Sequence, residues 1–231
     1  TPLGSASIGQ VYRAKLKSNG EEVAVKVQKP NSREIIESDV RIMKFLANRM
    51  DRYISVTRTY NLPAMISEFE RSIFKEINFL EETMNLQNFS RNFRSVVYIK
   101  IPDVYLDYCT EKVITMELIR GIKITDLIKG DYPDINKKKI ANYGVKSYFK
   151  QIMIDGFFHA DPHAGNLIIL DDNVVCYIDL GSVGILDDDF RKDLCDLLML
   201  IADQDVNGVI NQFIYMGILN YAMDTTRLKR D

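Results

Sequence analysis

The chain alternates short β-rich runs with longer segments of helical periodicity. Residues 10–16 (QVYRAKL) and 22–28 (EVAVKVQ) have the composition of strands, and the Asn-Gly pair between them is a strong hairpin signal. Over residues 33–54 the apolar positions step by three or four, which predicts an amphipathic helix. A second helix is predicted after Pro63, because one apolar seam continues with the same steps. The residues of that seam are Ile66, Phe69, Ile73, Ile77, Leu80 and Met84.

The later part of the chain repeats this alternation with different proportions. Residues 96–106 and 113–119 are rich in β-branched and aromatic residues and predict two more strands around a turn. A long helix is predicted over about 137–155, ending at a glycine. A hairpin of residues 166–170 and 174–178 should follow it, and two closing helices should complete the chain.

The change of pattern near Arg120 predicts two lobes. A strand-rich first part with inserted helices, residues 1–119, precedes a mainly helical part, residues 120–231. This order predicts an α+β fold with an antiparallel sheet in the first lobe and a cleft between the lobes. The total of 231 residues, 46% of them apolar, is enough for such a pair.

Charge and cysteine content exclude several classes of partner. Thirty Lys and Arg oppose 32 Asp and Glu, so no global basic field exists to bind nucleic acid. The three cysteines lack CxxC or Cys/His spacing, which argues against zinc and disulfides and for a reducing compartment. The uncharged stretch 206–223 contains amides and has helical spacing, so we expect a buried amphipathic helix and not a membrane span. We also expect the chain to be a fragment, since it opens within a functional element.

Small residues near the N-terminus have the spacing of a glycine-rich nucleotide loop. The pattern GxGxxGxV fits from Gly4 to Val11, with Ala6 at the middle glycine position. Small residues let backbone amides approach phosphate oxygens, and the β-carbon of Ala6 restricts that approach. Small-residue turns between strands are common, so this loop by itself is weak evidence. The nucleotide contacts predicted here are Gly4, Ser5, Ala6, Ser7, Ile8, Gly9 and Val11.

A lysine lies within an apolar strand pattern seventeen residues after Gly9. Strand alternation places Lys26 and Ala24 on the face opposite Val23 and its neighbours. A lysine there would be costly without a partner, and in a nucleotide kinase it would reach the α- and β-phosphates and be held by a helix glutamate. Glu76 and Glu82 are both candidates, and they lie about 120° apart on one helix, so only one can face the lysine.

The strongest chemical signal is the run HADPHAGN, followed thirteen residues later by Asp-Leu-Gly. Phosphoryl transfer needs a carboxylate to orient or deprotonate the acceptor and oxygen ligands for Mg²⁺. Asp161 is the predicted base, and Asn166 is a predicted metal ligand. The predicted hairpin would return Asp179 to the same place as the second ligand. His159 is expected to have a structural role, because the motif already contains a better-placed carboxylate.

Residues 116–118 could be the hinge that meets adenine. Met116, Glu117 and Leu118 end a predicted strand just before the lobe boundary. A plain buried strand would have the same composition, so both interpretations stay open at this point.

In their order, these motifs resemble the protein-kinase-like superfamily and, within it, the UbiB family of atypical kinases. The loop SASIGQV, a helix motif like Glu-x-Asp and HADPH-x-GN in place of HRD carry the resemblance. Asn78 replaces the aspartate of the helix motif, and Ala164 replaces the usual proline of the catalytic loop. The resemblance implies a kinase-like fold, binding of ATP with Mg²⁺, and a link to isoprenoid quinone (coenzyme Q) biosynthesis or lipid metabolism. It also implies a cytoplasmic or organelle-internal location, with peripheral membrane contact, and an N-terminal extension with a KxGQ motif.

The distance between motifs bears on the acceptor. Only Ser182 to Leu186 separate Gly181 from Asp187, a predicted N-cap for the next helix. This leaves no room for a long activation segment, and no A-P-E follows. We therefore expect a small-molecule or lipid acceptor, such as a quinone precursor, or plain ATP hydrolysis.

Two other hypotheses remain. A small-molecule kinase similar to aminoglycoside and choline phosphotransferases would share the H-x-D-x-x-x-x-N loop, but the SASIGQV loop and the helical insert before Glu76 speak against it. A pseudokinase that binds nucleotide only to switch a partner surface is weakened by the presence of Lys26, Asp161, Asn166 and Asp179.

Overall fold

The computed structural model describes residues 2–5, 8–53 and 61–219. The chain divides into two compact units, which we call unit 1 (Thr1–Ile140 and Pro162–Ser182) and unit 2 (Ala141–Asp161 and Val183–Asp231). The boundaries of these compact units differ from the lobe boundary expected between residues 119 and 120. The division into two lobes at that point stays a prediction.

Unit 1 begins with a four-stranded antiparallel sheet. It consists of β1 (Gly4–Ser5), β2 (Gly9–Lys15), β3 (Glu22–Gln28) and β5 (Val113–Glu117), in the order β1-β2-β3-β5. The predicted hairpin is confirmed as β2 and β3. Its turn contains Gly20 with φ of +76°, a left-handed conformation that glycine adopts without strain.

A second four-stranded sheet in unit 1 is formed from distant parts of the chain. It consists of β4 (Ile99–Lys100), β6 (Ile122–Lys123), β8 (Leu167–Ile169) and β9 (Val175–Tyr177), in the order β4-β9-β8-β6. β4 pairs with β9 in parallel, and the other pairs are antiparallel. The predicted hairpin of residues 166–170 and 174–178 is confirmed as β8 and β9.

The strand expected over residues 96–106 is wrong in extent. Only β4 forms a ladder there, and a 3₁₀ turn, η1 (Leu106–Tyr108), follows. Pro102 is buried just after β4, and proline has no backbone N–H with which to continue a ladder.

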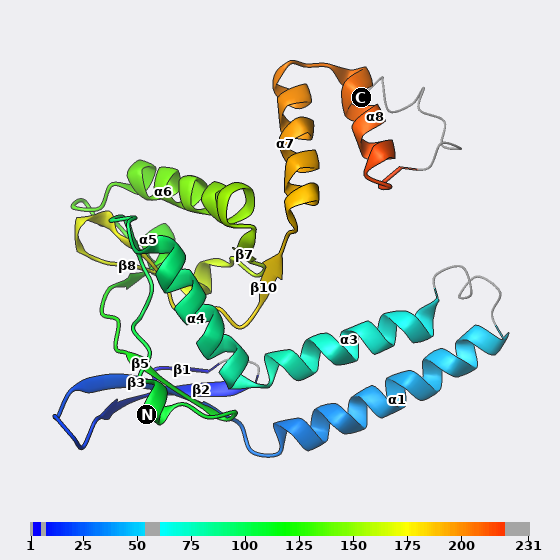
Figure 1. Cartoon of the computed structure of the whole chain (residues 1–231). Coiled ribbons are helices and arrows are strands. Elements are labelled where there is room, and N and C mark those ends of the chain that lie inside the picture. The colour runs from blue at the N-terminus through cyan, green and yellow to red at the C-terminus, as the bar shows by residue number, and fades with distance from the viewer. Residues whose placement is uncertain (1, 6–7, 54–60, 220–231) are drawn as a thin grey trace. The chain divides into compact units, whose positions relative to one another are not determined.

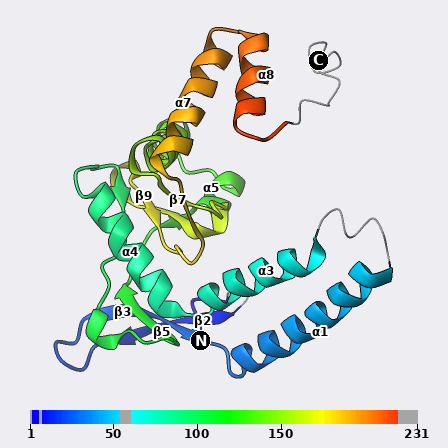
Figure 2. The same cartoon turned by 45° about the vertical axis from the view of Figure 1, so that its right-hand side comes forward.

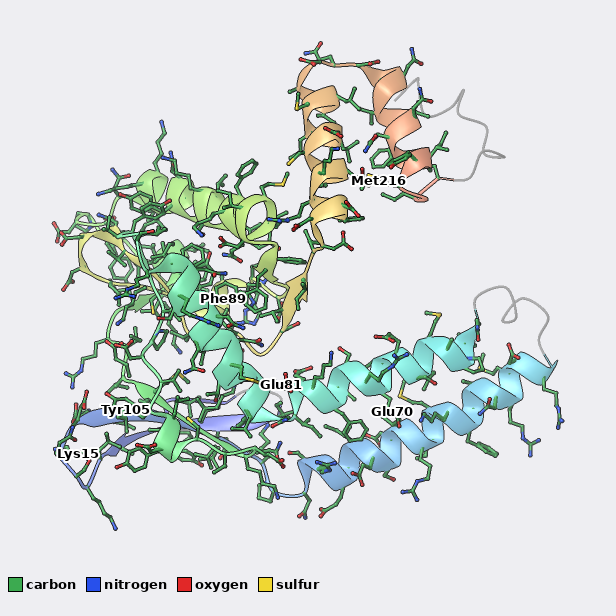
Figure 3. The ribbon with its side chains drawn as sticks, in the orientation of Figure 1. Lys15, Glu70, Glu81, Phe89, Tyr105 and Met216 are labelled. Atoms are coloured by element: carbon green, nitrogen blue, oxygen red, sulfur yellow. The ribbon has the colours of Figure 1, made fainter. Side chains whose placement is uncertain are left out.

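Two long helices form a hairpin in unit 1. α1 (Ser32–Tyr53) and α3 (Leu62–Glu76) lie side by side and project from one end of the first sheet (Figure 1, Figure 2). Val40 and Ala47 of α1 are buried. An ion pair between Lys44 of α1 and Glu70 of α3 adds a polar contact across the hairpin, and Glu70 is labelled in Figure 3. The helix predicted over residues 33–54 is confirmed as far as Tyr53, and residue 54 lies outside the described residues.

The seam predicted as one helix from Ile66 to Met84 is interrupted. α3 ends at Glu76, and a new helix, α4 (Phe79–Phe93), starts after Asn78. Asn78 is the N-cap of α4, and its side-chain oxygen accepts a hydrogen bond from the Leu80 amide at 3.2 Å. The restart changes which face is buried, so Leu80 and Met84 are exposed. The buried residues of α4 are Phe79, Glu82, Thr83, Leu86, Phe89 and Phe93.

α4 is the central core helix of unit 1. The ring of Phe89, labelled in Figure 3, stacks on Phe93 at 6.1 Å and lies 6.4 Å from Tyr177 of β9. This contact joins α4 to the second sheet. A short helix, α5 (Ile124–Lys129), follows β6 and buries Leu127. Complete burial of such apolar side chains is the main source of stability in a core. The largest fully buried apolar residues of the unit include Phe79, Phe89, Leu86, Ile114, Ile169 and Leu180.

Unit 2 begins within a continuous helical segment. α6 (Lys137–Phe149) has its first turn in unit 1 and continues in unit 2 as a π-helical turn, η2 (Lys150–Asp155). The segment ends at Gly156, whose φ of +61° is left-handed. The helix predicted over residues 137–155 is confirmed in its bounds, although its last turn is π and not α.

A short sheet and two helices complete unit 2. β7 (Phe157–His159) pairs with β10 (Val183–Ile185) in antiparallel register. α7 (Asp188–Ala202) and α8 (Val206–Tyr215) then pack side by side (Figure 2). Asp187 caps α7 as predicted, because its side chain accepts a hydrogen bond from the Phe190 amide at 2.7 Å. Among the described residues, none of the helices has the length and apolar character needed to cross a bilayer.

Candidate nucleotide site

A buried lysine is held by two carboxylates in unit 1. Lys26 of β3 is 5% exposed, and its Nζ lies 2.8 and 2.7 Å from the two carboxylate oxygens of Glu82. The same Nζ lies 3.1 Å from Oδ2 of Asp179. Glu82 is only 3% exposed, so the lysine–glutamate pair is almost completely removed from water. A buried charge is tolerated only when it is paired in this way.

The environment shifts both ionisations of this pair. Burial by itself lowers the pKa of Lys26, but the negative charges of Glu82 and Asp179 outweigh it and raise the pKa, so the lysine stays protonated. Burial raises the pKa of Glu82 to about 7, and the attraction of Lys26 opposes this change. Strongly perturbed carboxylates of this kind are concentrated at functional sites.

The interruption between α3 and α4 decides which glutamate meets the lysine. Glu76 is the exposed last residue of α3, whereas Glu82 lies on the buried face of α4. If one helix had continued from Ile66 to Met84, Glu82 would lie nearly opposite the core. Because α4 starts with a new phase, Glu82 is buried instead. The alternative left open by the sequence is resolved in favour of Glu82.

α4 also holds the segment that contains Asp179. Asn85 Nδ2 donates to the carbonyl oxygen of Leu180 at 2.9 Å, and the Glu82 carboxylate accepts a hydrogen bond from the Leu180 backbone. Within the segment, the Gly181 amide donates to Oδ1 of Asp179 at 3.0 Å. The Asp-Leu-Gly turn is therefore fixed by α4 on one side and by its own backbone.

A cavity of about 450 Å³ lies against this set of charges. Cross-strand register explains its wall, because Val11 pairs with Lys26 and Met116 pairs with Ala24, so these side chains share one face of the sheet. Nine predicted site residues line the cavity: Gly4, Val11, Ala24, Lys26, Met116, Glu117, Leu118, Asn166 and Asp179. A volume in this range is typical of small-molecule sites.

Some lining residues were not predicted. Arg13 could have been found, because it pairs with Ala24 and alternates with Val11 on the same face. Several of the others needed the tertiary structure, since they lie in or directly after strands β4, β6, β8 and β9 of the second sheet. The other unpredicted lining residues are Leu3, Pro102, Ile119, Arg120, Lys123, Ile168 and Ile178.

The loop residues have mixed outcomes. Ala6 and Ser7 lie outside the described residues, and of Ser5 only the backbone, in β1, is described. Ile8 and Gly9 are absent from the cavity wall. A β-carbon at Gly9 would come within 3.2 Å of the Phe79 ring and of the Val27 carbonyl oxygen. The glycine at this position therefore permits the close packing of β2 on α4.

Two predicted metal ligands lie on the wall of this cavity. Asn166 ends a 3₁₀ turn, η3 (Ala164–Asn166), directly before β8, and Asp179 follows β9, so the hairpin returns both to one place. Within the described residues, no cluster of three or more His, Cys, Asp or Glu side chains could hold a metal by itself. One carboxylate and one amide oxygen fit Mg²⁺, which keeps several waters and takes further ligands from phosphates.

The predicted base belongs to unit 2. Asp161 is exposed and follows β7, two residues after His159. His159 is 1% exposed and its amide donates to Oε1 of Gln151 at 2.9 Å, in agreement with a structural role. His163, which had no predicted role, is the N-cap of η3, because its Nδ1 accepts from the Gly165 amide at 3.0 Å.

A lysine strand, a helix glutamate and a hairpin Asp-Leu-Gly around one cavity are the features of a kinase-like protein. Comparison with known families is more specific, because residues 1–213 match the ABC1 atypical kinase-like domain. The chain belongs to this family, and the UbiB resemblance is confirmed.

Curated relatives are about one-third identical to the chain over the aligned residues. An uncharacterized protein of Synechocystis, slr1919, is 36% identical over 97% of the chain and 40% of its own length. A probable protein kinase UbiB of Photorhabdus laumondii is 34% identical over 93% of the chain and 40% of its length. Protein ACTIVITY OF BC1 COMPLEX KINASE 8, chloroplastic, of Arabidopsis thaliana is 33% identical over 99% and 30%. The chain thus spans less than half of these relatives.

A solved structure supports the same fold. Rv3197 of Mycobacterium tuberculosis, in a complex with erythromycin, aligns with a TM-score of 0.75 and 22% identity. The alignment covers 97% of this chain and 56% of that protein.

Proposed function

We propose that this protein binds ATP with Mg²⁺ in the 450 Å³ cavity and transfers or hydrolyses the terminal phosphoryl group. The observation that carries the proposal is a buried lysine on the cavity wall, Lys26, which is paired with Asp179 of the same wall and with the buried Glu82. The atypical kinase family of the chain supports the same reaction class. Phosphoryl transfer depends mainly on positioning and charge neutralisation, for which this arrangement is suited.

The predicted site residues have the following roles in this proposal. Lys26 would contact the α- and β-phosphates while Glu82 fixes its position. Asn166 and Asp179 would hold Mg²⁺, which neutralises charge on the phosphate oxygens when it is bound. The oxygen of the acceptor hydroxyl or water would form a bond to the γ-phosphorus while the bond between that phosphorus and ADP breaks. Asp161 would accept the proton that the attacking hydroxyl or water loses.

The adenine end of the cavity would be the segment after β5. The Glu117 amide already donates to the Asp103 carbonyl oxygen at 2.8 Å, so it is engaged within the protein. Leu118 and Ile119 follow directly and line the cavity. We therefore assign the backbone contact with adenine to these two residues.

The acceptor would be a small molecule or a lipid. Between Gly181 and the cap of α7 there are five residues, Ser182 to Leu186, and β10 takes up three of them. A segment this short offers little backbone for docking a peptide. The acceptor would be a quinone precursor at a membrane surface that faces the cytoplasm or the interior of an organelle. This choice follows from the link to isoprenoid quinone biosynthesis that the UbiB resemblance implies.

The proposal is tested by ATP turnover of the purified protein with and without Mg²⁺. Asp179→Asn and Asp161→Asn should each lower Mg²⁺-dependent turnover by about 100-fold or more. Lys26→Met should weaken ATP binding by about tenfold or more. Asp171→Asn is the matched control, because Asp171 is an exposed carboxylate in unit 1 that does not line the cavity.

Three results would contradict the proposal. Equal turnover in wild type and Asp161→Asn would remove the assigned base. Mg²⁺-dependent ATP binding without any turnover would favour a nucleotide-binding pseudokinase. Turnover that requires an aminoglycoside or choline would favour the small-molecule kinase hypothesis.

A further inference from the structure

The backbone of His159 is held by two side chains in unit 2. Its N–H donates to Oε1 of Gln151 at 2.9 Å, and its carbonyl oxygen accepts from the Tyr148 hydroxyl at 3.3 Å. Both polar groups of one peptide residue are therefore bonded by side chains. We call Tyr148 and Gln151, with these two bonds, the His159 clamp.

The helical segment before β7 brings the two side chains to the same place. Tyr148 is in the last turn of α6, and Gln151 is three residues later in the π-helical turn η2. Residues three apart share a helix face, so both can reach one strand end. The carbonyl oxygen of Gln151 also accepts from the Gly156 amide, so its backbone closes the helix while its side chain holds His159. Single π-turns are often located at functional sites.

Burial makes the two bonds of the clamp unequal. Gln151 is completely buried and His159 is 1% exposed, so their amide–amide bond is shielded from water. A buried polar group that loses its partner pays its full desolvation cost. Tyr148 is only half-buried, so its hydroxyl can find water if the bond is lost.

The strand that ends at His159 is too weakly supported to orient Asp161 by itself. β7 has three residues and, in the described part of the chain, pairs with β10. His159 is the last paired residue, and the exposed Asp161 is only two residues beyond it. The direction in which the Asp161 carboxylate leaves the strand depends on the backbone that the clamp holds.

We propose that Gln151 and Tyr148 are positioning residues that fix the backbone from which Asp161 acts. This inference rests on the proposed role of Asp161 as the base. A misplacement of about 1 Å can cost a factor of about 100 in rate, so loss of the clamp reduces the chemical step. Nucleotide binding is unaffected, because all the described residues that line the cavity with Lys26 and Asp179 belong to unit 1.

The test compares Gln151→Met and Tyr148→Phe with wild type. Methionine keeps the length of glutamine and removes the acceptor, and we expect kcat to fall by about 10- to 100-fold. Tyr148→Phe removes the longer hydrogen bond at a half-buried site. It should lower kcat by about threefold, which corresponds to the usual net contribution of one hydrogen bond. The KM for ATP should stay within about twofold in both variants, since ground-state binding is retained. Tyr215→Phe is the control, because Tyr215 is a 76% exposed tyrosine of α8 in the same unit.

A second readout is independent of activity. Hydrogen–deuterium exchange of a peptide containing residues 157–161 should be faster in Gln151→Met and unchanged in Tyr215→Phe. Tyr148→Phe keeps the kinetic test available if Gln151→Met does not fold.

The outcomes separate this inference from the proposed function. Unchanged kcat in both variants, with active wild type, would overturn the positioning role and leave the function standing. A parallel rise of KM and fall of kcat would also overturn it, because that pattern indicates a general structural defect. Absence of turnover in wild type would overturn the function, and the positioning role with it.

Discussion

Units 1 and 2 hold the segments that contain Asp179 and Asp161 with the same kind of device but with different chemistry. In unit 1, Glu82 and Asn85 of α4 bond the backbone of Leu180, next to Asp179. We call this arrangement the Leu180 clamp. In unit 2, Tyr148 and Gln151 bond both backbone groups of His159, two residues before Asp161. In each clamp the two side chains are three residues apart on one helical segment.

The difference between the clamps is the presence of charge. Glu82 belongs at the same time to the Leu180 clamp and to the ion pair with Lys26. A shift of Glu82 in the ion pair would therefore also move the Asp179 segment. The His159 clamp is neutral and includes no residue of the cavity wall. A buried charged clamp couples ligand binding to the backbone at the cost of desolvation, whereas a neutral clamp only fixes geometry.

The largest effect should follow from removing the charged member of the Leu180 clamp. Glu82→Ala leaves Lys26 buried beside Asp179 alone, and breaking a buried pair costs about 3–5 kcal/mol. Urea unfolding measures this loss. Glu81→Ala is the matched control one residue away on α4, expected within about 1 kcal/mol because an acidic residue in the first turn stabilises a helix by about that much at most. Equal losses in the two variants would show that the pair contributes nothing.

The charge of Glu82 should also make its contribution depend on pH. Because burial raises its pKa from 4.5 to about 7, its contribution to stability is present below pH 4.5 and is lost as the pH rises through about 7. The free-energy advantage of wild type over Glu82→Gln should therefore shrink between about pH 5 and pH 8, by roughly 1–3 kcal/mol. Urea unfolding at both pH values checks this, and a constant or growing advantage would contradict the raised pKa.

A smaller effect is expected from the neutral member of the Leu180 clamp. Asn85→Leu leaves the Leu180 carbonyl without its side-chain donor, which should cost about 1–3 kcal/mol. Turnover should fall while ATP binding changes little, because Lys26 keeps Glu82. The control is Gln87→Leu on the same helix, at an exposed position. An Asn85→Leu protein with wild-type stability and turnover would show that this bond does not hold the Asp179 segment.

The smallest effect concerns the cap of the helix that carries the Leu180 clamp. Asn78→Ala should cost about 1 kcal/mol in thermal unfolding, the usual worth of an N-cap. Asn78→Asp should retain or slightly raise stability, because aspartate also accepts the Leu80 amide and its charge favours a helix N-terminus. A loss in Asn78→Asp as large as in Asn78→Ala would mean that Asn78 does more than cap α4.

Much of the local structure could be predicted from the sequence because its causes are local. The Asn-Gly turn between β2 and β3, the end of the helical segment at Gly156 and the cap at Asp187 depend on conformational preferences of the residues themselves. Strand alternation correctly placed Lys26 and Ala24 on one face. The hairpin that returns Asp179 toward Asn166 was predictable from two short β-rich runs at a fixed spacing.

The partner of Lys26 could not be predicted, because a tertiary contact decides it. The apolar spacing continues from Ile73 through Ile77, so the local pattern gives no sign that a helix ends there. The Ile77 carbonyl oxygen instead accepts from Nε2 of Gln28 in β3 at 2.7 Å, and the Phe79 amide donates to the Glu111 carbonyl oxygen at 3.0 Å. These bonds to distant residues satisfy the backbone groups that a helix break exposes.

The sequence by itself therefore determined which chemical groups this protein possesses: a strand lysine, an Asp-x4-Asn loop and an Asp-Leu-Gly turn at kinase-like spacing. Only the tertiary structure decided how they are held, because the phase of α4 depends on the bond of the preceding Ile77 to β3 and on the bond of Phe79 to the turn before β5. That phase buries Glu82 against Lys26 and turns Asn85 toward Leu180. The physical reason is that helical periodicity reports the face of a helix but not where distant partners make the helix begin again.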